Sequence, residues 1–241
     1  IALLLAYQAT GSFDFDVWRS QGSSLSVLWQ GVLYASVLIG FGAKAGIIPL
    51  HIWLPEAHPA APSHVSARMS GVMIKTALFM IIRFFFDFFP GASVEWGLVL
   101  LAFGAVATLL GVLYALSEND IKRLLAYSSI ENIGIILLGI GAALVFMNYG
   151  LQDFFVFALA AALFHIVNHA LFKSLLFLTA GSVAAATGTR NMEAYGGLIR
   201  LLPYTAFFFF VGALAISAFP PLNGFASEWL IFQSLFVGIA A

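Results

Sequence analysis

Cysteine is absent from all 241 residues of this sequence. The sequence therefore excludes disulfides, thiolate metal sites and iron–sulfur clusters held by its own cysteines. Charged residues are also scarce, at 9% of the sequence, against about 25% in an average soluble domain. The formal net charge of −1 gives no basic surface for nucleic acid. We expect no cofactor in this chain and no nucleic-acid partner, so any redox centre is expected on another chain.

Apolar residues dominate what is present: 62% of the sequence is hydrophobic and its mean hydropathy is +1.01. Several apolar runs reach the roughly 20 residues that a membrane-spanning helix needs. The sequence predicts an all-α, polytopic transmembrane bundle embedded in a lipid bilayer. The expected spans cover about residues 1–10, 25–54, 65–89, 94–116, 124–147, 154–186 and 202 onward.

Both ends of the sequence lie in apolar runs. It starts without an initiator methionine or the basic segment of a signal peptide. We expect residues 1–241 to be a fragment of one transmembrane domain, with about seven spans of which the first and last are incomplete.

Two of the expected spans contain a helix break beside an ionisable residue. Lys44 precedes a break near Gly46 to Pro49, and Glu228 follows a break near Pro220 to Gly224. Proline removes an amide donor and blocks helical dihedrals. Paired broken spans are typical of transporters built from inverted repeats. Irregular backbone at membrane depth needs protein or water around it, so we expect both breaks to be shielded from lipid.

The span over residues 154–186 carries His165, His169 and Lys173 at four-residue spacing. Each step advances about 40° and rises about 6 Å, so the three side chains form a ladder on one helix face. Ionisable residues inside a membrane are costly and usually functional. The ladder predicts a path for charge.

Four more ionisable residues lie within the expected spans, and together with the ladder they make seven relay residues. These are Lys44, Lys75, Glu131, His165, His169, Lys173 and Glu228. Lysine and histidine can gain and lose protons when neighbours and burial adjust them, whereas arginine stays charged. We expect the seven to form one hydrated axis near mid-membrane, with neighbours about 6–12 Å apart so that one to three waters bridge them.

Structural roles are the alternatives for these residues. Lys75 could extend its ammonium to the interface, the two glutamates could only pair with lysines, and the histidines could only bond neighbouring helices. A zinc site at the two histidines is disfavoured, because Lys173 shares their face. His51, Glu56, His58 and His64 follow the first break, where a solvated loop is favoured over a proton entrance.

If the spans alternate in direction across the membrane, more basic residues fall on one membrane face than on the other. The larger group, which the positive-inside rule assigns to the cytoplasm, comprises Arg68, Lys122, Arg123, Arg190 and Arg200. Arg19 and Arg83 fall on the opposite face.

Four blocks of sequence resemble one superfamily in order. They are GAKAGIIPLHIWLPEAHPAAPSHVSARMSGVMIKTALFMIIR, NDIKRLLAYSSIENIG, FHIVNHALFKSLLFLTAGSV and GGLIRLLPYTAFFFFVGALAISAFPPLNGFASEWLIFQ. They are similar to the antiporter-like membrane subunits of respiratory complex I, Mrp-type cation/proton antiporters and membrane-bound hydrogenases. HPAAPSHVSA, SSIENIG and PPLNGFASEWL most resemble the large membrane subunit of formate hydrogenlyase and hydrogenase-4 complexes.

The resemblance implies proton transfer by Lys44, Lys75, His165, His169, Lys173 and Glu228. Glu228 stands where other branches have lysine, and a glutamate that pairs with the first lysine lies outside this sequence. The resemblance also implies a multi-pass protein of a bacterial or archaeal cytoplasmic membrane. Its implied partners are other membrane subunits and a peripheral hydrogenase or related redox arm that holds the nickel–iron and iron–sulfur centres.

The sequence thus predicts a proton-translocating, non-catalytic subunit of an energy-converting redox complex. Two alternatives within transport remain, an Mrp-type Na⁺/H⁺ antiporter subunit or a complex I antiporter-like subunit. A histidine-liganded membrane metalloenzyme and an inert scaffold remain alternatives outside transport.

Overall fold

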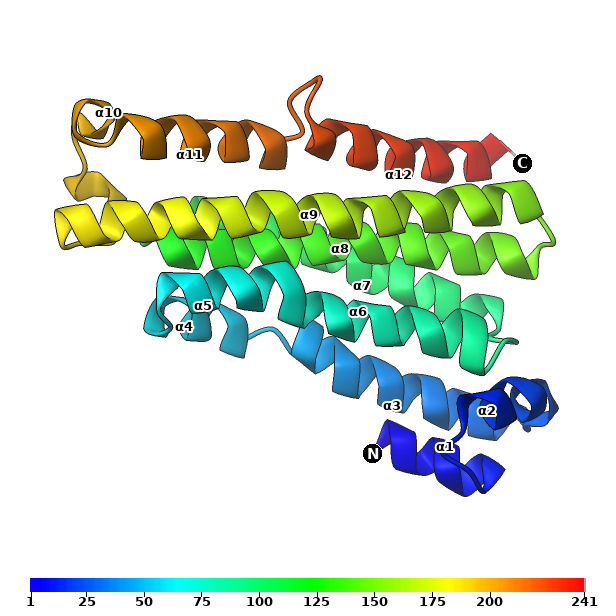
Figure 1. Cartoon of the computed structure of the whole chain (residues 1–241). Helices are drawn as coiled ribbons and strands as arrows, with labels where there is room; N and C mark the ends of the chain where they lie inside the picture. The colour runs from blue at the N-terminus through cyan, green and yellow to red at the C-terminus, as the bar shows by residue number, and fades with distance from the viewer. Residues whose placement is uncertain (241) are drawn as a thin grey trace.

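The computed structural model describes residues 1–240, with side chains through residue 236. Long helices run side by side, and α11 and α12 lie end to end along the outer side of α9 (Figure 1). In chain order the α-helices are α1 (Ala2–Thr10), α2 (Phe15–Gln21), α3 (Val27–Ala45), α4 (Trp53–Ala60), α5 (Ser63–Arg68), α6 (Ile74–Arg83), α7 (Val94–Leu116), α8 (Ile121–Asn148), α9 (Gln152–Thr187), α10 (Leu198–Leu201), α11 (Pro203–Ile216) and α12 (Asn223–Ala240).

The expected spans are confirmed as helices. In the part of the chain that the structure describes, five helical stretches are long and apolar enough to cross a membrane: Val27–Ala45, Ser63–Phe88, Val94–Leu116, Ile121–Asn148 and Gln152–Thr187. The stretch Ser63–Phe88 holds a feature that the sequence did not predict. Its α-helical turns are interrupted by π-helical segments at Met69–Met73 and Phe84–Phe88. Such wider turns often mark functional sites in helices.

The first break separates α3 from α4, as expected. Gly46 ends α3 in the left-handed region, with φ of 84°, and a Cβ there would lie 2.7 Å from Leu54. The indole Nε1 of Trp53 donates to the carbonyl of Ala43 across the gap at 2.7 Å, which occupies an acceptor freed by the end of the helix. Ile47 and Ile48 are buried, so protein shields this part of the break.

The second break separates α11 from α12, also as expected. In the described structure Pro220 and Pro221 are exposed, and their loop projects away from α9 (Figure 1). That neighbouring helices shield this break from lipid stays a prediction. Only the inner edge is covered: Gly224 packs so closely on Ala215 that a Cβ would clash with its carbonyl oxygen.

Glycines set the packing of α7 against α8. Gly97, Gly104 and Gly111 recur every seventh residue of α7 and face the α8 backbone. A Cβ at Gly104 would lie 2.8 Å from the carbonyl oxygen of Gly134, and a Cβ at Gly134 would lie 2.5 Å from the amide nitrogen of Thr108. Small residues of this kind let transmembrane helices approach closely, because lipid is as apolar as the helix sides and gives no hydrophobic drive.

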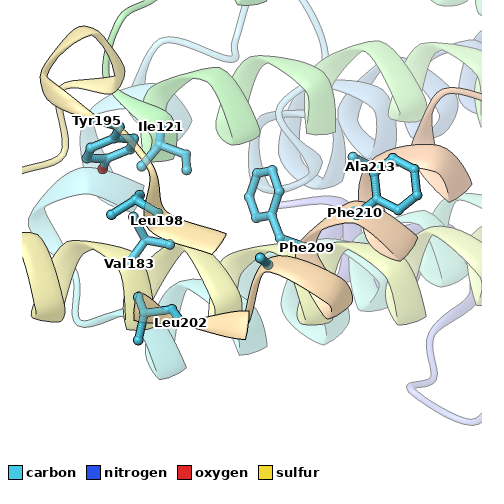
Figure 2. A pocket seen from close by; sticks show the side chains of 9 residues that line it. Ile121, Val183, Tyr195, Leu198, Leu202, Phe209, Phe210 and Ala213 are labelled. Carbon is cyan, nitrogen blue, oxygen red and sulfur yellow. The ribbon is translucent and has the colours of Figure 1, made fainter. Parts of the chain in front are cut away.

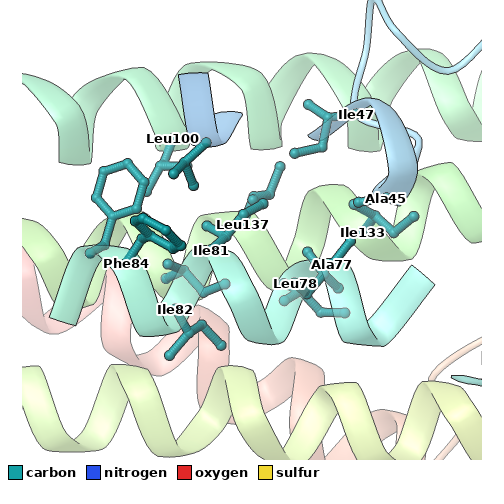
Figure 3. Packing of buried hydrophobic residues seen from close by; sticks show 14 of the residues in the cluster. Ala45, Ile47, Ala77, Leu78, Ile81, Ile82, Phe84, Leu100, Ile133 and Leu137 are labelled. Atoms are coloured by element: carbon teal, nitrogen blue, oxygen red, sulfur yellow. The ribbon is translucent and has the colours of Figure 1, made fainter. Parts of the chain in front are cut away.

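The largest buried cluster lies between α3, α6, α7 and α8. Leu78 and Ile81 point inward from α6 toward Ile133 and Leu137 of α8 (Figure 3), and Phe84 packs on Phe41 of α3. This packing fixes α6, and with it Lys75, against α8.

Ion pairs gather at the two ends of the bundle. At one end Arg123 Nη1 lies 2.8 Å from Glu56 Oε1, and Arg190 Nε lies 3.0 Å from Asp120 Oδ2. At the other end Asp87 binds both Arg19 and Arg83, as expected for the Arg83–Asp87 spacing. Arg123 and Arg190 therefore lie at the opposite end from Arg19 and Arg83, as expected.

The α7–α8 contact predicts a large effect of a side chain at Gly134. Gly134→Leu places carbon against the backbone of α7, and overpacking of this kind costs roughly 1–3 kcal/mol or more. The variant should unfold at a lower temperature in detergent than the parent. Gly31→Leu is the control, because a Cβ at Gly31 meets nothing within 4 Å. Equal melting temperatures for the two variants would contradict this account of the contact.

Candidate proton relay

Lys173 is held at the centre of α9 by α8. Its side chain is fully buried, and its ammonium donates to the carbonyl of Leu125 at 2.9 Å and to Ser128 Oγ at 2.6 Å. Ser128 can accept because its own hydroxyl donates to the carbonyl of Leu124 at 3.1 Å. Neutral oxygens thus solvate a charge that apolar surroundings alone would not tolerate.

Lys75 joins the same network from α6. Its ammonium donates to the carbonyl of Ser70, inside the first π-helical segment. The Ser70 hydroxyl lies 2.9 Å from Ser129 Oγ, and Ser129 in turn donates to the carbonyl of Leu125 at 2.9 Å, the same oxygen that Lys173 uses. Ser70 therefore bonds Lys75 through its backbone carbonyl and Ser129 through its hydroxyl, so the two lysines lie in one cluster of buried polar groups.

Close helix contact makes this cluster possible. Gly71, in the π-helical segment, lies so near α9 that a Cβ there would clash with Ser174 Oγ. Lys75 and Lys173 consequently lie near enough for their charges to act on each other. Within the described residues no carboxylate oxygen lies within 4 Å of either ammonium.

His165 continues the network toward the second break. Its Nε2 lies 3.2 Å from Asn132 Oδ1 on α8, and its Nδ1 lies 2.9 Å from Ser227 Oγ on α12. Asn132 also donates from Nδ2 to the carbonyl of Ser128 at 2.9 Å. The network thus runs from Lys75 through α8 to the first turn of α12.

His169 lies between these groups with no hydrogen-bond partner. Its side chain is fully buried, and neither ring nitrogen has a partner among the described residues. Its ring is parallel to that of His165, with 6.4 Å between centroids, and it packs on Phe172. Buried polar atoms in this position normally bind internal water.

The two glutamates border the network. Glu131 and Glu228 are partly buried, and Glu131 is near enough to both Lys173 and Glu228 for their charges to interact. Glu131 and Ser128 open onto a groove of about 410 Å³ between α8 and α11, beside Ser217 at the second break. An adjoining groove of about 350 Å³ is lined almost wholly by apolar side chains, among them Phe209 and Leu202 (Figure 2).

Lys44 is the one relay residue that the structure does not bring to the others. It lies in the last turn of α3, exposed on a groove of about 430 Å³ beside the first residues of α1. The other six relay residues lie on α6, α8, α9 and α12, where they are buried or partly buried.

The hydrogen-bonding residues between the relay residues were missed by the sequence reasoning. They are Ser70, Ser128, Ser129, Asn132 and Ser227. Ser128, Ser129 and Asn132 follow one another at helical spacing in the SSIEN stretch, and this apolar span gives little other reason for polar side chains there. This spacing is the feature of the sequence that could have predicted these hydrogen-bonding residues.

His58 also differs from its expected place. We expected the residues after the first break to form a solvated loop, but His58 is fully buried in α4 and stacks on Phe177 of α9 with ring centroids 4.5 Å apart. The reason is that α4 packs against α8. Glu56 and His64 are exposed, as a solvated segment requires.

Metal ligands do not cluster in the part of the chain that the structure describes, where no group of three or more histidine or acidic side chains could hold an ion.

A family model described as "NADH:quinone oxidoreductase/Mrp antiporter, TM" matches residues 1–239. The chain belongs to this family. It therefore corresponds to part of an antiporter-like membrane subunit of the hydrogenase, complex I and Mrp superfamily.

Among curated relatives, the chain is 51% identical to hydrogenase-4 component B of Escherichia coli (strain K12), over 98% of this chain and 35% of that protein. It is 42% identical to formate hydrogenlyase subunit 3 of the same organism, over 98% of this chain and 38% of that protein. A Na(+)/H(+) antiporter subunit of Alkalihalophilus pseudofirmus is 38% identical, over 96% of this chain and 29% of that protein. The chain thus spans about a third of the length of these relatives.

Solved structures show the same fold. A chain of the Mrp complex from Dietzia sp. DQ12-45-1b matches with a TM-score of 0.86 and 27% identity, over 98% of this chain and 41% of that one. A chain of respiratory complex I from Thermus thermophilus matches with a TM-score of 0.83 and 25% identity, over 97% and 48%. The expected antiporter-like fold with two broken helices is confirmed.

The acceptors around Lys173 predict that its ammonium is dispensable for folding. In Lys173→Met, Leu125 keeps the Ser129 bond and Ser128 keeps the Leu124 bond, so no buried group loses its last partner. Replacing a buried charge by an apolar side chain is then neutral or stabilising. Thermal unfolding of the full-length protein should occur at or above the parent temperature.

Asn132→Leu is the comparison variant. It leaves His165 Nε2 against an apolar side chain, and an unsatisfied buried group costs about 1–3 kcal/mol. If Lys173→Met melted lower than Asn132→Leu, the hydrogen bonds described around Lys173 would be wrong.

Proposed function

We propose that this chain is part of a proton-translocating membrane subunit of an energy-converting redox complex of the hydrogenase-4 or formate hydrogenlyase type. Protons move near mid-membrane through the relay residues Lys44, Lys75, Glu131, His165, His169, Lys173 and Glu228. The chain itself makes and breaks no substrate bonds.

The observation that supports this most is the series of buried polar groups from Lys75 to the second break. It includes Ser70 and Ser129, the Leu125 carbonyl shared with Lys173, and Asn132, His165 and Ser227. A structural role for one lysine needs only one acceptor. Carbonyl oxygens only accept, so water has to join the groups of this series that can donate.

Internal water completes the path in this proposal. The two ring nitrogens of His169 are buried without a protein partner in the described structure, and the charges of Lys75 and Lys173 both act on its ring. Water bound there would connect the ladder to the lysines. The groove beside Ser128 and Glu131 gives water a second position at the edge of the network.

Membership of a larger assembly follows from the same proposal. The partners are other membrane subunits and a peripheral hydrogenase or related redox arm, which holds the nickel–iron and iron–sulfur centres. The location is a bacterial or archaeal cytoplasmic membrane. Identity supports this assignment over the alternatives, since hydrogenase-4 component B and formate hydrogenlyase subunit 3 are 51% and 42% identical to the chain.

Membership of an Mrp-type cation/proton antiporter is the second proposal. The 38% identity to the Na(+)/H(+) antiporter protein of Alkalihalophilus pseudofirmus supports it. The two proposals differ in what drives transport: redox turnover in one, and a sodium gradient in the other. Proteins that co-purify with the full-length chain separate them.

Replacement of Lys173 should abolish proton translocation while the complex still assembles. In Lys173→Ala the carrier is lost, although the helix tolerates alanine well. Lys173→Arg should also impair transport, because arginine does not release its proton. His169→Ala should reduce transport sharply. Proton uptake is measured in sealed vesicles with the redox reaction running.

Thr179→Ala is the matched control on the same helix. Thr179 is buried, and its hydroxyl donates only to the α9 carbonyls of Leu175 and Leu176. It should translocate protons like the parent. Normal translocation by an assembled Lys173→Ala complex would refute the relay, and transport retained in Lys173→Arg would show that a fixed charge suffices.

A further inference from the structure

His165 is the only relay residue of the described structure whose two ring nitrogens both have side-chain partners. A histidine that conducts takes a proton on one ring nitrogen and releases it from the other. Whether His165 can do so depends on what its two neighbours accept and donate, because neutral imidazole has one donor and one acceptor nitrogen.

The backbone of α8 decides the orientation of the first neighbour. The carbonyl oxygen of Ser128 can only accept, so the group that Asn132 places 2.9 Å from it is the amide nitrogen Nδ2. The other end of this amide, the acceptor Oδ1, therefore faces His165 Nε2 at 3.2 Å. An oxygen there requires a proton on Nε2.

The second neighbour adapts to either state of the ring. Ser227 Oγ lies 2.9 Å from His165 Nδ1, and also 3.1 Å and 3.2 Å from the carbonyl oxygens of Asn223 and Gly224. When Nδ1 is unprotonated, the Ser227 hydroxyl donates to it. When Nδ1 carries a proton, Nδ1 donates to Ser227, and the hydroxyl turns to the carbonyls at the start of α12.

We propose that Asn132 fixes His165 in the Nε2–H tautomer, so that only Nδ1, which faces Ser227 and the second break, gains and loses a proton. Asn132 is then a positioning residue. His165 does not pass protons from ring nitrogen to ring nitrogen. Its charge state reverses a hydrogen bond in the first turn of α12, next to Glu228. This inference deepens the proposed function and rests on it for its role in transport.

The tautomer is measured directly in the full-length protein in its complex. Histidine labelled with ¹⁵N gives separate nitrogen signals for protonated and unprotonated ring positions, and the His165 signals are those lost in His165→Gln. Neutral His165 should show a protonated Nε2 and an unprotonated Nδ1. A protonated Nδ1 in the neutral parent ring would overturn the proposal, whether or not any variant folds.

Two asparagine variants test the cause. Asn132→Ala removes the fixed acceptor, so the preference for the Nε2–H tautomer should be lost and proton translocation should fall. Asn168→Ala is the matched control: Asn168 is buried on α9 and bonds Asn223 at the same break, but in the described structure it makes no hydrogen bond to His165. It should keep the parent tautomer. An unchanged tautomer in Asn132→Ala would overturn the role of Asn132.

The two experiments distinguish an error in the tautomer assignment from an error in the proposed function. If Lys173→Ala translocates protons normally while neutral His165 is protonated on Nε2, the proposed function is wrong and the tautomer assignment stands. If Lys173→Ala loses transport while neutral His165 is protonated on Nδ1, the function stands and this inference is wrong.

Discussion

The buried ammonium of Lys173 imposes the main constraint on this bundle. A charge in apolar surroundings needs hydrogen-bond acceptors that stay in place. Here α8 supplies them, as a backbone carbonyl at Leu125 and the hydroxyl of Ser128. Ser128 is polar within an apolar span for that reason, whereas the folding of the bundle depends on how the helices pack.

At the two helix breaks, side chains donate hydrogen bonds to backbone carbonyls. At the first break the indole of Trp53 binds the freed carbonyl of Ala43, and at the second the amide of Asn168 binds the carbonyl of Asn223. In the π-helical segment the Ser70 carbonyl receives Lys75. Each of these irregular segments thus has a backbone carbonyl that accepts a hydrogen bond from a side chain. In the π-helical segment that side chain belongs to Lys75, which is itself a relay residue.

The sequence predicted the spans and both breaks, because span length and the effect of proline on helix backbone depend only on residues that are neighbours in the sequence. It predicted the ladder on α9 for the same reason, since four-residue spacing alone places its three side chains on one face. It could not predict the burial of His58, which depends on how α4 packs on α8 and α9. Nor could it predict that Lys44 lies apart or that Pro220 is exposed, because these depend on which helices lie beside α3 and α11. The π-helical turn before Lys75 has no periodic signal at all.

The seven-residue spacing of Gly97, Gly104 and Gly111 has a mechanical consequence. Seven residues fall short of two full turns of a straight helix by about 20°, so a strict glycine stripe stays in contact only if α7 and α8 wind around each other left-handedly. A small axial slip of either helix would push a Cβ into backbone, as the 2.5–2.8 Å approaches at Gly134 and Gly104 indicate. The close glycine contacts therefore oppose sliding of α7 along α8.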